Sequence, residues 1–425
     1  MSETALGKRY ADWTPPKRPD WVEQVNNEGR CMDIQSVVPL DENSLLRTAK
    51  TNTGLDEFGD DDWHEPFKVL TESIDSEAEL TLMGRLMSRN ELLLYLEGRL
   101  RIEDCYKRHP EIDSEEIESP LFIIGQGRSG TSVLQNMMSM DPDNGTILHW
   151  EALFPYPPPE KATYRSDPRI EKAHALLTQM NRVTPEIQAM HEFAGHLPIE
   201  NIQLHCLNFR SPGWFNSFAG QAPTYLAYMS KQDNALIYRY EKRVLKFLQW
   251  KNPRKHWVLK NPYSILHLPD VLKVYPDAKF IWTHRDPIKA LSSEISLIGT
   301  LNWIRSDHPF IGESLASFTD ASLVAAMLSQ PIDWLKSGAL PKAQLCNIQY
   351  DEFVKSPMNV IENIYAQFGV EMTPTGRAAM QKYMDDNPRS SRPSHQYDLG
   401  SVARVQKERE LFRRYQEYFS VRSET

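Results

Sequence analysis

The segment Pro120-Leu-Phe-Ile-Ile-Gly-Gln-Gly-Arg-Ser-Gly-Thr-Ser132 decides the fold of this 425-residue chain. Its first half is a short, continuous apolar run, which predicts a buried strand. Its second half is rich in glycine, and the following residues carry apolar side chains at helical spacing as far as Asp141-Pro142. A strand, a glycine-rich turn and a helix in this order are typical of a phosphate-binding loop.

The composition of the turn suits an anion. Gly127 and Gly130 give the backbone the freedom in φ that a nest of N–H groups needs. Arg128 adds a fixed positive charge in a planar fork that matches phosphate or sulfate. Hydroxyl donors complete the set, and they come from Ser129, Thr131 and Ser132.

The turn differs from the kinase loop G-x-x-x-x-G-K-[ST] in one essential position. Three of its positions fit, namely Gly125, Gly130 and Ser132. Thr131 stands where the kinase lysine belongs, and the charge lies three residues earlier at Arg128. The nearest candidate for a magnesium-binding aspartate is Asp286, which directly follows Arg285. The sequence therefore disfavours cleavage of ATP or GTP.

Further strand-like runs follow the loop at 257–260, 279–284 and 345–350, and helical patterns lie between and after them. Pro287 stands at the start of one of these helices, where proline is favourable. Strands alternating with helices predict an α/β fold, here a P-loop-like parallel β-sheet flanked by helices. Because ligands bind at the carboxyl ends of parallel strands, the loop lies where a site is expected.

The flanking regions divide the chain into an N-terminal arm, residues 1–75, and one large domain, residues 76–425. The arm is rich in Pro, Asp, Asn and Trp without strong periodicity, which predicts an extended segment wrapped on the body or partly disordered. A helical lead-in is predicted for 77–110, so that the N-terminal extension as a whole is mainly helical. The α/β core is expected at about 120–370, and a closing loop and a last helix at 385–425.

Bulk properties restrict the function classes. The net charge is −9, so the chain is a poor general binder of nucleic acid and any phosphate site must be local. No apolar run approaches the roughly 18 residues of a membrane helix, and the N-terminus has no apolar signal region. The four cysteines form no CxxC pair, which favours reduced, mostly buried thiols in a cytoplasmic protein without a metal site.

Two segments together resemble the sulfotransferases that use 3′-phosphoadenosine 5′-phosphosulfate (PAPS). The first is PLFIIGQGRSGTSVL, whose arginine-type loop is similar to that of tyrosylprotein sulfotransferases and many bacterial enzymes. The second is WVLKNPYSILHLPDVLKVYPDAKFIWTHRDPIKALSS, which has a lysine before Asn-Pro, then Arg285-Asp, then Ser293 eight residues after the arginine. The resemblance extends from about residue 80 to 419.

The resemblance implies roles for individual residues. The 5′-phosphosulfate would be held by Arg128, Ser129, Gly130, Thr131 and Ser132, and the 3′-phosphate by Arg285 and Ser293. Tyr350 looks like the family tyrosine near the adenine. The segment from Arg389 to His395 has the composition of a loop that closes over the 3′-phosphate, with Arg392 as its candidate residue.

Sulfuryl transfer needs positive charge on the leaving phosphate and a base for the acceptor's proton. Arg128 and Lys260 are the predicted sources of charge. Glu151 is the predicted base, because the arginine-type branch has a glutamate slightly more than twenty residues after the loop arginine; His149 is the second choice. More distant candidates are His191 and Glu200. The aromatic residues in 209–228 either line an apolar acceptor pocket or belong to the core.

The predicted function is therefore transfer of a sulfuryl group from PAPS, with 3′-phosphoadenosine 5′-phosphate (PAP) as product, to a hydroxyl of a small, apolar acceptor. Two alternatives stay open at this point: a nucleotide kinase or ATPase with a degenerate loop, and a non-catalytic nucleotide-binding protein. The sequence identifies neither the acceptor nor the role of the arm, and it leaves open whether the chain forms a homo-oligomer.

Overall fold

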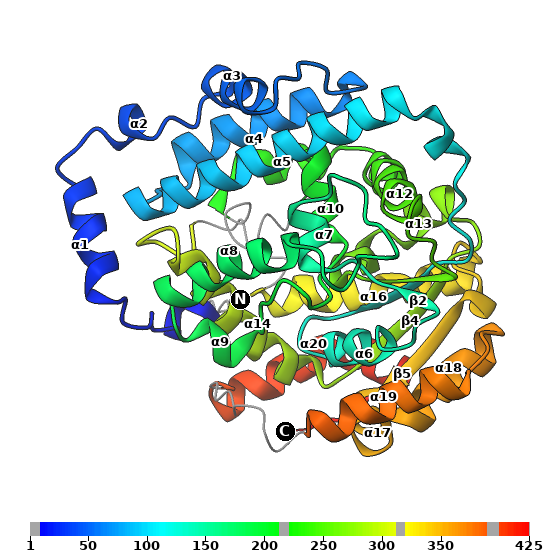
Figure 1. Ribbon diagram of the computed structural model, residues 1–425. Coiled ribbons are helices and arrows are strands. Elements are labelled where there is room, and N and C mark those ends of the chain that lie inside the picture. The colour runs from blue at the N-terminus through cyan, green and yellow to red at the C-terminus, as the bar shows by residue number, and fades with distance from the viewer. Residues whose placement is uncertain (1–8, 212–220, 312–318, 389–398, 425) are drawn as a thin grey trace.

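A five-stranded parallel sheet lies at the centre of the molecule. The computed structural model describes residues 9–211, 221–311, 319–388 and 399–424 (Figure 1). The strand order is β2-β3-β1-β4-β5, and every neighbouring pair is parallel. The strands are β1 (Leu121–Gly125), β2 (Asn144–Gly145), β3 (His256–Lys260), β4 (Lys279–His284) and β5 (Leu345–Gln349). The predicted parallel α/β fold is confirmed.

Side chains of the central strand alternate between the two faces of the sheet. Phe122 and Ile124 join one apolar cluster, whereas Leu121 and Ile123 join another. The first cluster includes residues of α5 (Leu82–Arg108), α12 (Ala235–Gln249), α16 (Ala321–Ser337) and α20 (Val402–Phe419). The second includes residues of α6 (Thr131–Met138), α18 (Pro357–Phe368) and α19 (Pro374–Asp386). Both faces are thus covered, which explains why β1 reads as a continuous apolar run.

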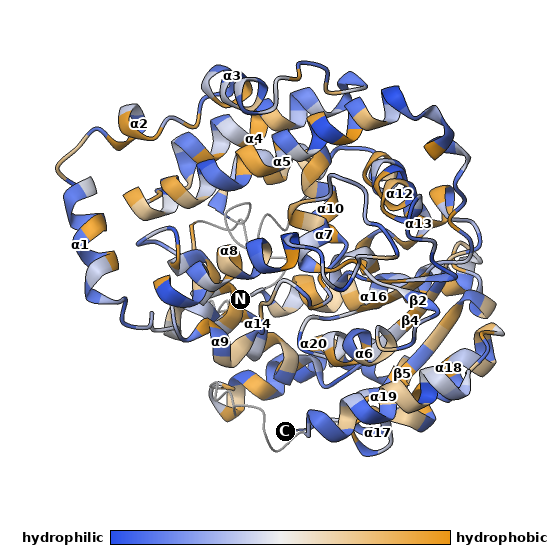
Figure 2. Ribbon diagram, in the orientation of Figure 1, coloured by the Kyte–Doolittle hydropathy of each residue, from blue (hydrophilic) through white to orange (hydrophobic). Residues whose placement is uncertain are grey.

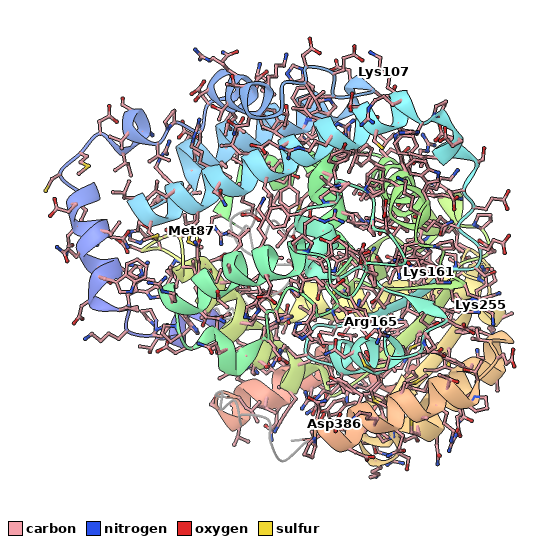
Figure 3. All side chains as sticks on the ribbon, viewed as in Figure 1. Met87, Lys107, Lys161, Arg165, Lys255 and Asp386 are labelled. Carbon is pink, nitrogen blue, oxygen red and sulfur yellow. The ribbon has the colours of Figure 1, made fainter. Side chains whose placement is uncertain are left out.

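The distribution of polarity follows from this layering. Figure 2 shows apolar residues gathered on the strands and on the helix faces toward them. The charged residues Lys107, Lys255 and Asp386 are exposed and project at the edge of the molecule (Figure 3).

All four cysteines are free, and three of them are buried, as predicted. Within the described parts of the chain, every helix is too short or too polar to cross a membrane.

The helix α14 (Pro287–Trp303) begins directly after β4 and carries much of the site described below. Asp286 caps its first turn, where the carboxylate accepts a hydrogen bond from the Ile288 N–H. The same carboxylate pairs with Arg409 of α20 at 2.8 and 3.0 Å. Asp286 therefore caps the start of α14 and ties it to α20.

Most predicted elements lie where the patterns put them. The strands at 257–260, 279–284 and 345–350 correspond to β3, β4 and β5, and the last helix is α20 as expected. The two-residue strand β2 was not predicted, because two residues carry no periodicity. After α5, the described chain also contains the short helices α7 (His149–Leu153), α9 (Ile187–Met190), α10 (Ile202–His205), α11 (Pro223–Met229), α13 (Leu268–Val274) and α17 (Tyr350–Lys355), and the longer α8 (Arg169–Val183).

The N-terminal arm differs from its prediction, since its described part is helical rather than extended. It contains α1 (Asp20–Gly29), α2 (Ile34–Val37), α3 (Glu42–Thr53) and α4 (His64–Glu77). The first three are short or bury few side chains; α3, for example, buries only Leu45 and Ala49. Such short apolar faces leave a weak periodic signal, and α1 and α3 are stabilised by packing on α5. The longer α4 packs against α11 and buries six side chains, so its pattern was missed rather than absent. The helical pattern expected from 77 begins at Leu82.

The first described residues of the arm pack along α14. Arg9 donates a hydrogen bond from Nη1 to the Ser292 hydroxyl at 2.7 Å. Farther along the helix, the Trp303 indole donates to the Pro16 carbonyl at 3.0 Å, and Arg18 donates to the Trp303 carbonyl at 2.7 Å. The arm therefore braces α14 from Ser292 to its carboxyl end.

We expect Leu259→Ala to lower the free energy of unfolding by about 2–5 kcal/mol, because Leu259 is fully buried on the sheet. Leu411→Ala is the matched control: it removes the same atoms from a side chain that is 40% exposed, and it should change stability by less than about 0.5 kcal/mol. Urea unfolding followed by tryptophan fluorescence measures both. Equal losses would contradict the core position of Leu259.

Candidate active site

The turn between β1 and α6 has an unusual backbone. Gly125, Arg128 and Gly130 all have positive φ, at 140°, 66° and 94°. Glycine adopts these values at little cost, but a side chain such as that of Arg128 does so only when its surroundings hold it there. The strained residue therefore marks a position at which the fold imposes the conformation, as functional loops often do.

Arg128 is held by contacts from three elements. Its carbonyl oxygen accepts a hydrogen bond from Nη1 of Arg285 at 2.7 Å, at the end of β4. Its own Nε donates to the Ser293 hydroxyl of α14 at 3.0 Å, and its Nη1 donates to the Met190 carbonyl at 2.9 Å. The two residues predicted for the 3′-phosphate, Arg285 and Ser293, are thus brought together at the loop.

Lys260 brings a second positive charge to the loop from the neighbouring strand. Only 2% of its surface is exposed. Its Nζ donates to the Ser132 hydroxyl at 3.3 Å and forms an ion pair with Glu200 at 2.6 Å. Because β3 ends beside β1, the Lys260 side chain reaches the loop from the neighbouring strand. In a kinase, the loop itself supplies this lysine.

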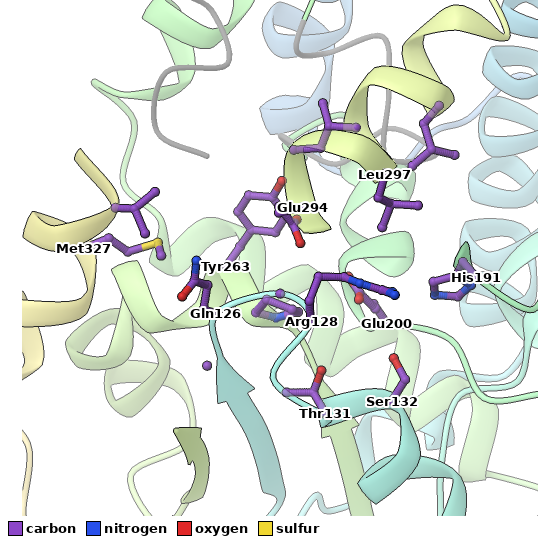
Figure 4. A pocket seen from close by; sticks show the side chains of 16 residues that line it. Gln126, Arg128, Thr131, Ser132, His191, Glu200, Tyr263, Glu294, Leu297 and Met327 are labelled. Carbon is purple, nitrogen blue, oxygen red and sulfur yellow. The ribbon is translucent and has the colours of Figure 1, made fainter. Parts of the chain in front are cut away.

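A pocket opens over the loop (Figure 4). Its polar wall includes Arg128, Thr131 and Ser132 of the loop together with Glu200, His191, Tyr263 and Glu294. Its apolar wall comes from α14 and α16 and consists of Leu297, Ile298, Leu301, Val324 and Met327. The pocket thus joins an anion-binding end to an apolar end.

Two of the predicted loop contacts are not at the pocket. The Ser129 hydroxyl points into the protein, where it donates to the Gln126 carbonyl at 2.6 Å and lies 2.7 Å from the Thr283 hydroxyl. Gly130 packs against Tyr350, and a Cβ at residue 130 would lie 3.1 Å from that ring. Both residues shape the turn, while Thr131 and Ser132 face the pocket.

Tyr350 lies beside Arg285, whose guanidinium carbon is 4.2 Å from the centre of the tyrosine ring. Tyr350 is the first residue of α17, not the end of a strand as the pattern suggested. Nε and Nη2 of Arg285 also donate to the two carboxylate oxygens of Glu424, at 2.8 and 3.1 Å. A carboxylate is therefore bound at the guanidinium edge that was predicted to bind phosphate.

Glu151, the predicted base, does not line the pocket. It is fully buried, and its carboxylate pairs with Arg254 at 3.0 Å and accepts from the Tyr164 hydroxyl and the Leu148 N–H, each at 2.9 Å. Burial raises its pKa, and Arg254 opposes that rise. With all these partners inside the protein, Glu151 has the surroundings of a structural ion pair.

His149, the second choice, is also buried away from the pocket. Its Nδ1 lies 2.9 Å from the Leu197 carbonyl. Burial lowers its pKa to about 4, and the charge of Lys260 contributes to that lowering. His149 is therefore neutral at ordinary pH. Its contact with Leu197 supports the segment between α9 and α10.

Four titratable groups besides Arg128 line the pocket. His191 and Glu200 were distant candidates in the sequence, while Tyr263 and Glu294 were missed. Burial raises the pKa of Glu294 to about 7 and holds the pKa of Tyr263 well above its usual range. Burial and the charge of Lys260 lower the pKa of His191 to about 3. The feature of the sequence that could have identified Glu294 is its place directly after Ser293, on the helix that follows β4.

Other predicted contributors lie elsewhere. Phe209 and Tyr225 of the aromatic stretch are buried in the core, in the cluster that covers one face of the sheet. The rest of that stretch around Trp214, Phe215 and Phe218, and the candidate Arg392, lie outside the described residues. Among the residues that are described, no group of three or more His, Cys, Asp or Glu side chains is arranged to hold a metal ion.

The fold and the loop define an α/β protein of the P-loop-like class, in which an arginine of the loop and a lysine from the next strand supply positive charge. The family described as the sulfotransferase family matches residues 120–374, which is more than half of the chain. This protein therefore belongs to the sulfotransferase family and is a sulfotransferase, as the sequence resemblance predicted.

Solved structures and curated relatives agree. Sulfotransferase STF9 from Mycobacterium avium has a TM-score of 0.76 at 25% identity, over 90% of this chain and 98% of that one. Sulfotransferase STF1 from Mycobacterium tuberculosis H37Rv has a TM-score of 0.70 at 25% identity, over 87% and 98%. The omega-hydroxy-beta-dihydromenaquinone-9 sulfotransferase Stf3 of Mycobacterium bovis is 22% identical over 300 residues, covering 68% of this chain and 72% of its own.

We expect Glu151→Ala to lower the free energy of unfolding by about 3–5 kcal/mol, because Arg254 would be left buried without its partner. Arg254→Ala should cost a similar amount, and the double variant less than the sum of the two. Chemical unfolding of the four proteins measures this coupling. If the Glu151→Ala protein instead folds and binds PAP normally but no longer turns over its substrate, Glu151 is a catalytic residue and not a structural one.

Proposed function

We propose that this sulfotransferase moves a sulfuryl group from PAPS to a hydroxyl of an apolar acceptor, and that PAP leaves as the product. The observation that carries the proposal is the convergence of Arg128 and Lys260 on one phosphate-binding loop at the end of β1. The sequence predicted both residues as suppliers of charge. Negative charge develops on the bridging oxygen as the sulfur–oxygen bond breaks, so fixed cations there lower the barrier.

The 5′ end of the donor would bind at the loop. Thr131 and Ser132 begin α6 and offer hydroxyl groups to the pocket, and the helix N-terminus adds unpaired N–H groups. Lys260 already contacts Ser132, so its ammonium lies within reach of an anion bound there. Glu200 keeps this buried ammonium paired while no anion is bound.

The 3′-phosphate would bind at Arg285 and Ser293. Arg285 presents two N–H groups in parallel, and in this structure they bind the Glu424 carboxylate in the same bidentate manner in which arginine binds phosphate. Tyr350 stacks under the guanidinium and keeps its orientation. Magnesium has no part in this proposal, because the protein's own cations carry the charge.

The acceptor would bind at the apolar wall formed by α14 and α16. Aliphatic and thioether side chains there exclude water and cannot hydrogen-bond a polar substrate. The relative Stf3 is named for a hydroxylated menaquinone derivative, which combines a hydroxyl with an apolar body. We therefore infer a hydroxylated, lipid-like acceptor. The predicted compartment is the cytoplasm, where the four free thiols would stay reduced.

Calorimetry tests the donor site. PAP should bind at least about tenfold more tightly than ADP, with no effect of magnesium, because only PAP has the 3′-phosphate that Arg285 can clamp. Arg285→Ala should abolish this preference; because Arg285 also holds the Arg128 carbonyl, the affinity for ADP should fall too, but less than the affinity for PAP. Equal binding of both nucleotides, or binding only with magnesium, would rule out the assigned 3′-phosphate site.

Lys260→Ala should reduce kcat about 10²–10³-fold, because the leaving phosphate would lose a preorganised cation. PAP release from PAPS in the presence of a hydroxylated acceptor measures the rate. Lys255→Ala is the matched control, since Lys255 is an exposed lysine five residues away and pairs only with Asp143 among the contacts of the described chain. Unchanged turnover in Lys260→Ala would remove Lys260 from the mechanism.

Glu424→Gln should raise the affinity for PAP several-fold, because the 3′-phosphate must displace the Glu424 carboxylate from Arg285. The gain should be absent for adenosine 5′-phosphosulfate, which has no 3′-phosphate. Glu417→Gln, a neighbouring exposed carboxylate of α20, is the control. Weaker PAP binding in Glu424→Gln would mean that Glu424 supports the donor site instead of competing for it.

A further inference from the structure

The acceptor's proton needs a base, and neither Glu151 nor His149 faces the pocket. The titratable groups that do are His191, Glu200, Tyr263 and Glu294. Tyr263 keeps its proton because burial holds its pKa well above the usual range. His191 is a poor proton acceptor because burial, Lys260 and Arg128 all disfavour its cationic form. The choice is therefore between the two glutamates.

The two glutamates have different partners in the pocket. Glu200 pairs with Lys260, which also contacts Ser132, so it belongs to the loop side where the leaving phosphate would be. Glu294 lies over the loop, beside Tyr263 (Figure 4). It shares one face of α14 with Leu297, Ile298 and Leu301, at the spacing of a single helix face. Glu294 is thus the carboxylate on the acceptor side.

The loop is shaped around this carboxylate. Gly127 lies so close that a Cβ at residue 127 would overlap the carboxylate of Glu294. The glycine lets Glu294 lie directly over the loop, next to the place where the sulfuryl group would be transferred. The neighbouring residue Ser293 holds Arg128, so the same helix turn orients the loop arginine and the carboxylate.

The electrostatic surroundings suit a base. Glu294 is faced by Arg128 on the loop, Lys260 on β3, Glu200 before α10, and Tyr263 after β3. Burial and the charge of Glu200 raise its pKa, and the two cations oppose that rise, which gives a value of about 7. A base with a pKa near the working pH accepts a proton readily and still ionises between turnovers.

We propose that Glu294 is the general base of the transfer reaction, a role that rests on the proposed function of the pocket. Its carboxylate takes the proton from the acceptor hydroxyl while that oxygen forms a bond to sulfur. The bond from sulfur to the 5′-phosphate oxygen breaks, and its electron pair stays on that oxygen beside Lys260 and Arg128. The products are the sulfate ester, PAP and protonated Glu294, with no change in oxidation state.

The test compares Glu294→Gln with the wild-type enzyme in PAPS turnover, followed as PAP release with a hydroxylated menaquinone as acceptor. We expect kcat/KM to fall about 10²–10⁴-fold, while PAP binds as tightly as before. The wild-type rate should rise with pH through about 7, because Glu294 must be ionised, and this limb should be absent from the variant. Formate should partly restore the rate of Glu294→Ala, which a purely structural role would not allow.

Glu200→Gln is the matched variant. It removes a negative neighbour of Glu294, so the acid limb should remain and move to lower pH. If Glu294→Gln keeps the wild-type rate and pH profile, or if the limb disappears only in Glu200→Gln, Glu294 is not the base.

Failure of the base assignment and failure of the proposed function give different results. If only the base assignment is wrong, PAP still binds and the wild type still uses PAPS. If the wild type does not turn over that acceptor, slow hydrolysis of PAPS by water at the same site provides the same comparison of pH profiles. A wild type that neither binds PAP nor uses PAPS would instead overturn the proposed function.

Discussion

The site depends on the left-handed conformation of Arg128 and on the contacts that maintain it. A residue with a side chain adopts φ of 66° only when its neighbours hold it. Here Arg285 binds its carbonyl oxygen and Ser293 binds its guanidinium, so the end of β1 is tied both to the end of β4 and to α14. The loop proposed to bind the anion, the arginine assigned to the second phosphate and the helix with the proposed base are thereby held as one unit.

This arrangement also explains how the loop works without the lysine of a kinase loop. In a parallel sheet, the carboxyl ends of neighbouring strands meet at one edge, so a cation can come from any of them. Lys260 of β3 uses that freedom, and Glu200 keeps its buried charge paired. Positive charge is then built into the sheet edge itself, and a reaction at this site can rely on the protein's own groups for stabilisation of the leaving oxygen.

Local patterns in the sequence were sufficient for β1, β3, β4 and β5, the loop and the last helix, because a fully buried strand and a glycine-rich turn are each encoded by a few adjacent residues. The loop and a strand end pointed to Arg128 and Lys260, and the resemblance to sulfotransferases pointed to Arg285 and Ser293; the fold brings these residues together. The spacing from Arg128 to Glu151 was not sufficient, because it says nothing of Arg254, which lies more than a hundred residues later and binds that carboxylate inside the protein. Glu294 was missed for the converse reason: its importance arises from Gly127 and the pocket walls, which only tertiary packing places around it.

The brace on α14 has a consequence for the order in which the protein matures. Arg9 contacts both Ser292 and Glu408, residues that follow it by 283 and 399 positions. At roughly 5–20 residues per second, on the order of tens of seconds of synthesis separate these partners. The N-terminal residues are already made when α14 is synthesised, whereas α20, which carries Glu408, is made only after α14. The contact that joins the first described residues to both α14 and α20 is therefore complete only after nearly the whole chain has been made.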